Sequence, residues 1–156
     1  MKGKQVMSTV LIIIAVLVLA FSGRIVYENN QAPKLGVSEG KFKPLSSKPN
    51  NVSTQAQDPA KQVKPLSFKS DATSTMTAIK ASIDSYGGAK VIEETGDYLY
   101  VIFTTEKMKF NDDVEFWLDA TNQEVHFRSA SRAGYSDLGL NRKRYNELAN
   151  IYGSIN

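Results

Sequence analysis

The sequence predicts an α+β domain in which helices cover one face of an antiparallel sheet, preceded by an N-terminal transmembrane helix or signal. Three features indicate this. An apolar run without charges stands near the N-terminus, two segments place apolar residues at the helical period, and short stretches of β-branched and aromatic residues lie between turn residues. The elements after the apolar run follow the order β-α-β-β-β-β-α. Their short connections favour an antiparallel meander.

The apolar run lies between Lys4 and Arg24, and its centre, Val10 to Phe21, is wholly apolar. About 20 apolar residues cross a bilayer as a helix, so residues 6–23 are predicted to contact lipid. A buried core helix would keep a polar face, and this run has none. We therefore predict that residues 1–24 are a transmembrane anchor or a signal peptide.

Two locations for the rest of the chain stay open. The basic start at Lys2 and Lys4 favours a cytoplasmic N-terminus, which puts the domain on the periplasmic side of a bacterial inner membrane. Ala20-Phe21-Ser22 also fits a signal-peptide cleavage site, and cleavage there would release the domain into the periplasm. Basic residues directly after the span, beginning with Arg24, weaken the orientation signal.

Residues 25–61 are predicted to be a flexible basic tether. They are rich in Asn, Ser, Pro, Gly and Lys and show no helical or strand period. The lysines of this segment either remain solvated or contact anionic lipid headgroups. The folded domain is then predicted to comprise residues 62–156.

The first half of the domain is predicted to be a strand, a helix and a hairpin. The strand lies at Val63–Phe68, and Asp71 caps the helix that follows. One face of this helix is apolar, and Gly87-Gly88 end it. The residues of that face are Met76, Ile79, Ile83 and Tyr86. The hairpin strands are residues 89–95 and 98–107, joined at Gly96-Asp97.

The second half is predicted to be two more strands and a helix. Residues 112–120 and 124–130 form the strands, around a turn at Thr121-Asn122. Ser136 or Asp137 caps the last helix. Its inward-facing residues are Leu138, Tyr145, Leu148 and Ile151.

A two-residue turn at Thr121-Asn122 fixes the register of these two strands. It sets Glu115 opposite Arg128, and it pairs Phe116 with Phe127 and Leu118 with Val125 on the core face. The opposite face is polar and carries Asp113, Glu115, Trp117, Asp119, Glu124, His126 and Arg128. Such a face is either a solvated sheet surface or a binding surface, and an exposed Trp favours the second.

The acidic residues of this region offer two kinds of chemistry. Asp112, Asp113 and Glu115 could hold a hard cation or work as an acid–base pair, but successive strand residues point to opposite faces. His126 has no Ser or Cys nucleophile at recognisable spacing. Gly134 and Gly139 form no phosphate-binding pattern. The sequence therefore predicts no catalytic residue, no metal site and no cofactor.

The arginines of this region are predicted either to form ion pairs with nearby carboxylates or to hold an anionic ligand. The candidate ligand-binding residues are Asp112, Asp113, Glu115, Trp117, His126, Arg128, Arg132 and Asp137.

The charge distribution argues against nucleic acid as a partner. Residues 1–70 hold ten Lys/Arg and three Asp/Glu, a net charge of +7, whereas residues 71–156 hold nine and thirteen, a net charge of −4. An acidic domain is a poor partner for a polyanion. The absence of cysteine excludes disulfides and thiolate chemistry.

Three stretches resemble one family: LGVSEGKFKPLSSKPNNVSTQA, FNDDVEFWLD and HFRSASRAGYSDLGLNRKR. Together, over about residues 35–152, they are similar to DUF1499, the domain of unknown function 1499. Its members often carry an N-terminal signal or membrane segment. The resemblance implies no established activity, so it assigns no catalytic residues. Where the family pattern has two cysteines this chain has Leu45 and Asn51, so a function that needs that pair is absent.

The sequence thus predicts a membrane-tethered, non-catalytic envelope domain that binds an unknown protein partner or a small anionic ligand. The alternative is an envelope enzyme that uses the Asp/Glu/Arg/His face for hydrolysis or proton transfer. A deep pocket shared by Glu115, His126 and Arg128 would favour the enzyme, and a flat face would favour the binding domain.

Overall fold

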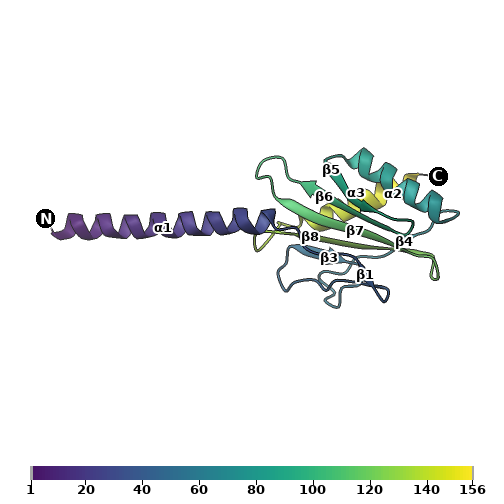
Figure 1. Ribbon diagram of the computed structural model, residues 1–156, viewed down its shortest axis with the longest axis horizontal. Coiled ribbons are helices and arrows are strands. Elements are labelled where there is room, and N and C mark those ends of the chain that lie inside the picture. The colour runs from purple at the N-terminus through teal and green to yellow at the C-terminus, as the bar shows by residue number, and fades with distance from the viewer. Residues whose placement is uncertain (1, 156) are drawn as a thin grey trace.

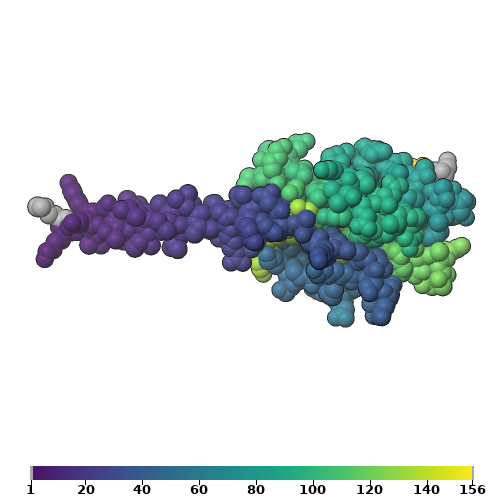
Figure 2. All heavy atoms as spheres, in the orientation of Figure 1, coloured from purple at the N-terminus to yellow at the C-terminus, as the bar shows by residue number. Residues whose placement is uncertain are grey.

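The computed structural model describes residues 2–155 and shows a long N-terminal helix that projects from a folded domain (Figure 1, Figure 2). The elements in chain order are α1 Lys2–Asn30, β1 Val37–Ser38, β2 Lys41–Phe42, β3 Asn51–Ser53, β4 Leu66–Ser67, α2 Ala72–Tyr86, β5 Ala89–Glu94, β6 Tyr98–Thr104, β7 Asn111–Asp119, β8 Glu124–Ser131 and α3 Leu140–Ser154. From β4 onward this is the predicted β-α-β-β-β-β-α order, and the α+β prediction is confirmed.

The main sheet is antiparallel and runs in the order β3-β8-β7-β6-β5, with β4 also paired to β8. Helices α2 and α3 lie on one of its faces (Figure 1). Between them and the sheet is the main core, where the rings of Phe116 and Phe127 meet edge to face at 5.1 Å. The predicted register is confirmed, because Glu115 pairs with Arg128 and Leu118 with Val125.

Helix α2 begins and ends where its sequence predicts. The Asp71 carboxylate accepts a hydrogen bond from the Ser74 backbone N–H at 2.7 Å, which satisfies a donor that the first turn leaves free. At the other end Gly87 has φ 80°, a conformation that residues with a Cβ rarely adopt, and its N–H bonds to the Ile83 carbonyl.

Helix α3 begins later than predicted. Its first residue is Leu140, and the predicted cap Asp137 lies in the preceding loop, where its carboxylate accepts from the backbone N–H groups of Gly139 and Asn141. Leu138 was expected to face inward, and this prediction is wrong, since its side chain is 96% exposed. The left-handed Gly139 turns the chain before the helical period starts, so Leu138 falls outside the helix.

The structure corrects the predicted boundary between tether and domain. Helix α1 continues to Asn30, and residues 35–61, which we call the covering segment, pack against the sheet. Strand β3 of this segment pairs with β8, and Val52 and Thr54 are buried. A domain beginning at residue 62 would therefore lack one of its strands.

Polar contacts explain how a segment with few apolar residues packs. The Gln55 side chain accepts from the Phe42 N–H at 2.8 Å and donates to the Gly40 carbonyl at 2.8 Å, which ties two parts of the covering segment together. The Asn51 side chain donates to Ser46 Oγ at 2.9 Å. Buried polar groups are tolerated when they are hydrogen-bonded in this way. The composition alone gave no sign of these pairings.

Candidate functional site

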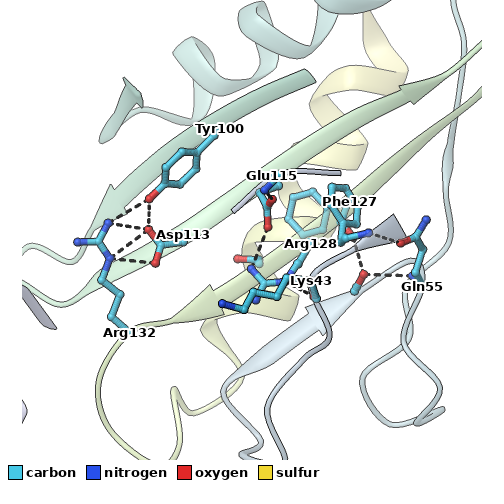
Figure 3. A network of polar contacts seen from close by, with 12 residues as sticks. Lys43, Gln55, Tyr100, Asp113, Glu115, Phe127, Arg128 and Arg132 are labelled. Carbon is cyan, nitrogen blue, oxygen red and sulfur yellow. Dashed lines mark hydrogen bonds and ion pairs between the residues drawn. The ribbon is translucent and has the colours of Figure 1, made fainter. Parts of the chain in front are cut away.

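The covering segment lies over much of the polar face of the sheet and shields Glu115 and Arg128 from solvent, whereas the Glu124 side chain at the start of β8 stays 45% exposed. Glu115 is 0% exposed and receives three hydrogen bonds, from Arg128 Nη1 at 2.9 Å, Tyr98 Oη at 2.8 Å and the Gly36 N–H at 3.0 Å. Arg128 Nε donates to the Lys43 carbonyl at 3.0 Å (Figure 3). A buried charge is stable only with such partners, so this pair joins the covering segment to the sheet.

A second ion pair lies beside the first. Arg132 Nε donates to Asp113 Oδ2 at 2.9 Å and Arg132 Nη2 donates to Asp113 Oδ1 at 2.7 Å, the planar two-point geometry typical of Arg and carboxylate. Tyr100 donates its hydroxyl proton to the same carboxylate (Figure 3). The hydrogen bonds to Asp113 raise the pKa of Arg132, and burial together with Asp113 raises the pKa of Tyr100 to about 12.

Trp117 and His126 pair with each other on the same face. Their rings stack at 5.1 Å with planes 14° apart, and Thr54 Oγ1 shares a hydrogen bond with His126 Nδ1 at 3.1 Å. Trp117 also packs against the cluster of Phe42, Tyr98 and Tyr100. Trp117, which the sequence predicted to be exposed, therefore packs against a cluster that includes Phe42 of the covering segment.

The two remaining candidates lie elsewhere. Asp112 points to the helix face, as strand alternation predicts, and binds Arg144 Nη2 at 2.6 Å. Asp137 receives hydrogen bonds from the backbone N–H and side-chain amide of Asn141, both at 2.7 Å. Neither lies with the Asp113–Arg132 pair. Among residues 2–155 no group of three His, Asp or Glu side chains could hold a metal ion.

A cavity of about 410 Å³ lies where the end of α1 meets the domain, and we call it the α1-end cavity. Three of the predicted site residues line it, Asp113, Arg128 and Arg132. Glu115 and His126 do not. The structure therefore brings three of the predicted ligand-binding residues together around this cavity, and the other predicted residues lie outside it.

Two lining residues of the α1-end cavity, Lys43 and Lys48, were assigned by the sequence to the tether. They reach the cavity because the covering segment folds back onto the sheet. Arg144 was also missed as the partner of Asp112. Its position on α3, opposite β7, depends on how the helix packs, which the local pattern does not contain.

The sequence model of a family described as "Protein of unknown function (DUF1499)" matches residues 41–151. No curated protein and no solved structure matches the chain. The match begins inside the covering segment, which agrees with the finding that this segment is part of the folded domain.

Proposed function

Because the chain belongs to the DUF1499 family, whose function is unknown, we propose a function from the geometry of the α1-end cavity. The protein is a membrane-tethered, non-catalytic domain of the bacterial envelope, and this cavity binds a small anionic ligand. The observation that carries the proposal is the convergence of Lys43, Lys48, Arg128 and Arg132 on one hollow of ligand size.

The charges around the cavity favour an anion. Two acidic side chains, Glu28 and Asp113, line it together with the four basic ones. Arg132 is paired with Asp113, and Arg128 is paired with Glu115 behind the wall. Lys48 lies 4.0 Å from Glu28, the limit of an ion pair, so the two lysines supply most of the positive field.

The pairing of the carboxylates supports binding rather than catalysis. A general acid or base must reach the substrate and exchange a proton with it. Glu115 and Asp113 are buried and each is bonded to an arginine and a tyrosine, so both serve as structural anions. The enzyme alternative needs one pocket shared by Glu115, His126 and Arg128, and the cavity that Arg128 lines includes neither of the other two.

The length and composition of helix α1 support the proposal that the protein is tethered to a membrane. Within residues 2–155 it is the helix long and apolar enough to cross a membrane, and none of its residues is buried. The ligand then binds next to the bilayer, where phosphate-bearing headgroups and free anions are both within reach.

The test is ligand binding by the full-length protein and by a Lys43→Gln, Lys48→Gln double variant. Inorganic phosphate is titrated against detergent-solubilised protein, and phosphatidylglycerol is compared with phosphatidylcholine in nanodiscs. We expect the loss of both lysines to weaken binding about tenfold or more, since each basic residue near anionic lipid contributes roughly 1 kcal/mol.

A Lys64→Gln, Lys90→Gln variant is the matched control, because both side chains are exposed and lie outside the cavity. Equal weakening by both double variants would show that net charge alone attracts the anion, and the cavity would be abandoned as the site. Weakening for phosphatidylglycerol but not for phosphate would identify the lipid headgroup as the source of the anion.

A further inference from the structure

A larger groove lies on the other side of the sheet, and we call it the helix-side groove. Its volume is about 1130 Å³, and it is bounded by the end of α2, one side of α3 from Leu140 to Ile151, and the loops at residues 105–110 and 132–139. Apolar side chains form much of its wall, among them Tyr86, Phe103, Phe110, Leu140 and Ile151. This volume is slightly above the usual range of small-molecule pockets, so an extended apolar group fits it.

The groove opens at the end of the domain that faces the anchor. Asn29, in the last turn of α1, donates to the Lys109 carbonyl at 2.8 Å and accepts from the Asn111 N–H at 2.7 Å. Both bounding loops lie at this end of the domain (Figure 1). The apolar run of α1 ends near Gly23, so roughly 10 Å of helix, at 1.5 Å per residue, separates the loops from the hydrocarbon. The interfacial layer is about 5 to 7 Å deep on each side, so the loops lie just beyond its outer boundary.

The rim of the groove exposes two large apolar side chains to solvent. Leu138 is 96% exposed and Met108 is 67% exposed. Leu138 also has φ 54°, a conformation that is uncommon for a residue with a Cβ, and its N–H is held by the Ser136 hydroxyl at 3.2 Å. Both the exposure and the backbone conformation are unfavourable for leucine in water. A rim in contact with lipid removes the first of these costs.

The floor of the groove is polar at one point. Arg144 lines the floor and is 2% exposed, and its Nε has no hydrogen-bond partner among the described residues. The other guanidinium nitrogens are bonded to Asp112 and Asn141. An unpaired buried donor is rare in proteins.

We propose that the helix-side groove takes up an acyl chain of a phospholipid from the leaflet next to which α1 holds the domain. Met108 and Leu138 form the entry, and the aromatic wall contacts the chain. The proposal rests on the membrane tether proposed above but not on the anion site of the α1-end cavity.

The experiment uses full-length protein in phosphatidylethanolamine vesicles with a trace of the same lipid carrying a photoactivatable diazirine in one acyl chain. After illumination, adducts are mapped by peptide mass spectrometry. We expect adducts in α1 and also in residues 103–110 and 138–151. Leu138→Asp and Met108→Asp together should lower the groove adducts by about tenfold, since each places a charge where an apolar side chain contacts lipid. The α1 adducts should not change.

Ile92→Asp is the matched control, because Ile92 is an exposed aliphatic side chain outside the groove. Thermal unfolding of all variants should be the same, since none of these side chains is buried. Adducts confined to α1 would overturn the groove proposal and leave the tether intact. An absence of adducts from α1 as well would overturn the tether itself. Groove adducts that persist in the Leu138→Asp, Met108→Asp variant would show nonspecific labelling, and the proposal would also fail.

Discussion

At the scale of single residues, the buried pair Glu115–Arg128 should dominate the response to mutation. Glu115→Gln or Arg128→Met leaves a buried charge without its partner, which costs about 3 to 5 kcal/mol of unfolding free energy. The double variant should lose much less than the sum of the two. The measurement is a double-mutant cycle by urea unfolding, and strictly additive losses would contradict the pairing.

The exposed pair Lys80–Glu94 provides the control for this cycle. Its atoms approach to 2.8 Å, close to the distance in the buried pair, yet both side chains are well exposed. Lys80→Met and Glu94→Gln should therefore each cost about 1 kcal/mol or less.

Tyr100 should make the folded state sensitive to alkaline pH. Burial raises its pKa first, and the hydrogen bond to Asp113 adds to this, so the pKa rises from 10.0 to about 12 in the folded state. Between these values the unfolded chain loses the tyrosine proton while the folded chain keeps it. Stability is therefore full below pH 10 and falls as the pH rises toward 12.

Urea unfolding of the wild type and of Tyr100→Phe, at pH 8 and at pH 11, measures this effect. The variant should lose less stability between the two pH values than the wild type. Part of the loss should remain, because burial and Glu115 also raise the pKa of Tyr98. An identical loss in both proteins would show that Tyr100 does not contribute.

At the scale of elements, the covering segment should be required for folding. A chain beginning at Pro33 should show a cooperative thermal transition. A chain beginning at Asp58 loses β3 from the edge of β8 and uncovers the Glu115–Arg128 pair, so its transition should be strongly lowered or absent. Equal transition temperatures for the two chains, measured by circular dichroism, would contradict a structural role for the segment.

The same segment marks the limit of what local sequence patterns predict. Periodicity and turn residues were sufficient for α2, for the strands from β5 to β8 and for the register of Glu115 opposite Arg128, because each is determined by neighbours in sequence. Of the strand predicted at Val63–Phe68 only Leu66–Ser67 forms, and it pairs with β8, far along the chain. The covering segment has no period, since hydrogen bonds from side chains such as Gln55 and Asn51 hold it. One signal was present, because the family resemblance extends back to residue 35, well inside the predicted tether.

The candidate site was predictable to a similar extent. Strand alternation separated Asp112 from Asp113 and identified the polar face. It did not show that residues 35–43 cover this face, or that Lys43 and Lys48 join Arg132 around a cavity. Contacts between segments far apart in the chain depend on tertiary packing, which a local pattern does not record.

At the scale of the whole molecule, the domain should lie outside the cytoplasm. The basic N-terminal tail and the apolar α1 predict this orientation. An alkaline phosphatase fused after residue 156 should be active, and a green fluorescent protein that requires the cytoplasm should be dark at the same position. The opposite pair of results would reverse the topology.

The pairing of β3 with β8 also sets an order of events while the chain is being made. The residues that follow α1 are synthesised early, yet Ser53 pairs with Arg128, about half the chain length away. Until β8 has been synthesised, β3 has no partner and Glu115 has no counter-ion. Closure must therefore come late, when β8 pairs with a segment that was made long before it. Such long-range pairing is slow to form, so the newly made chain passes through a period in which its sheet edge is open to chaperones and proteases.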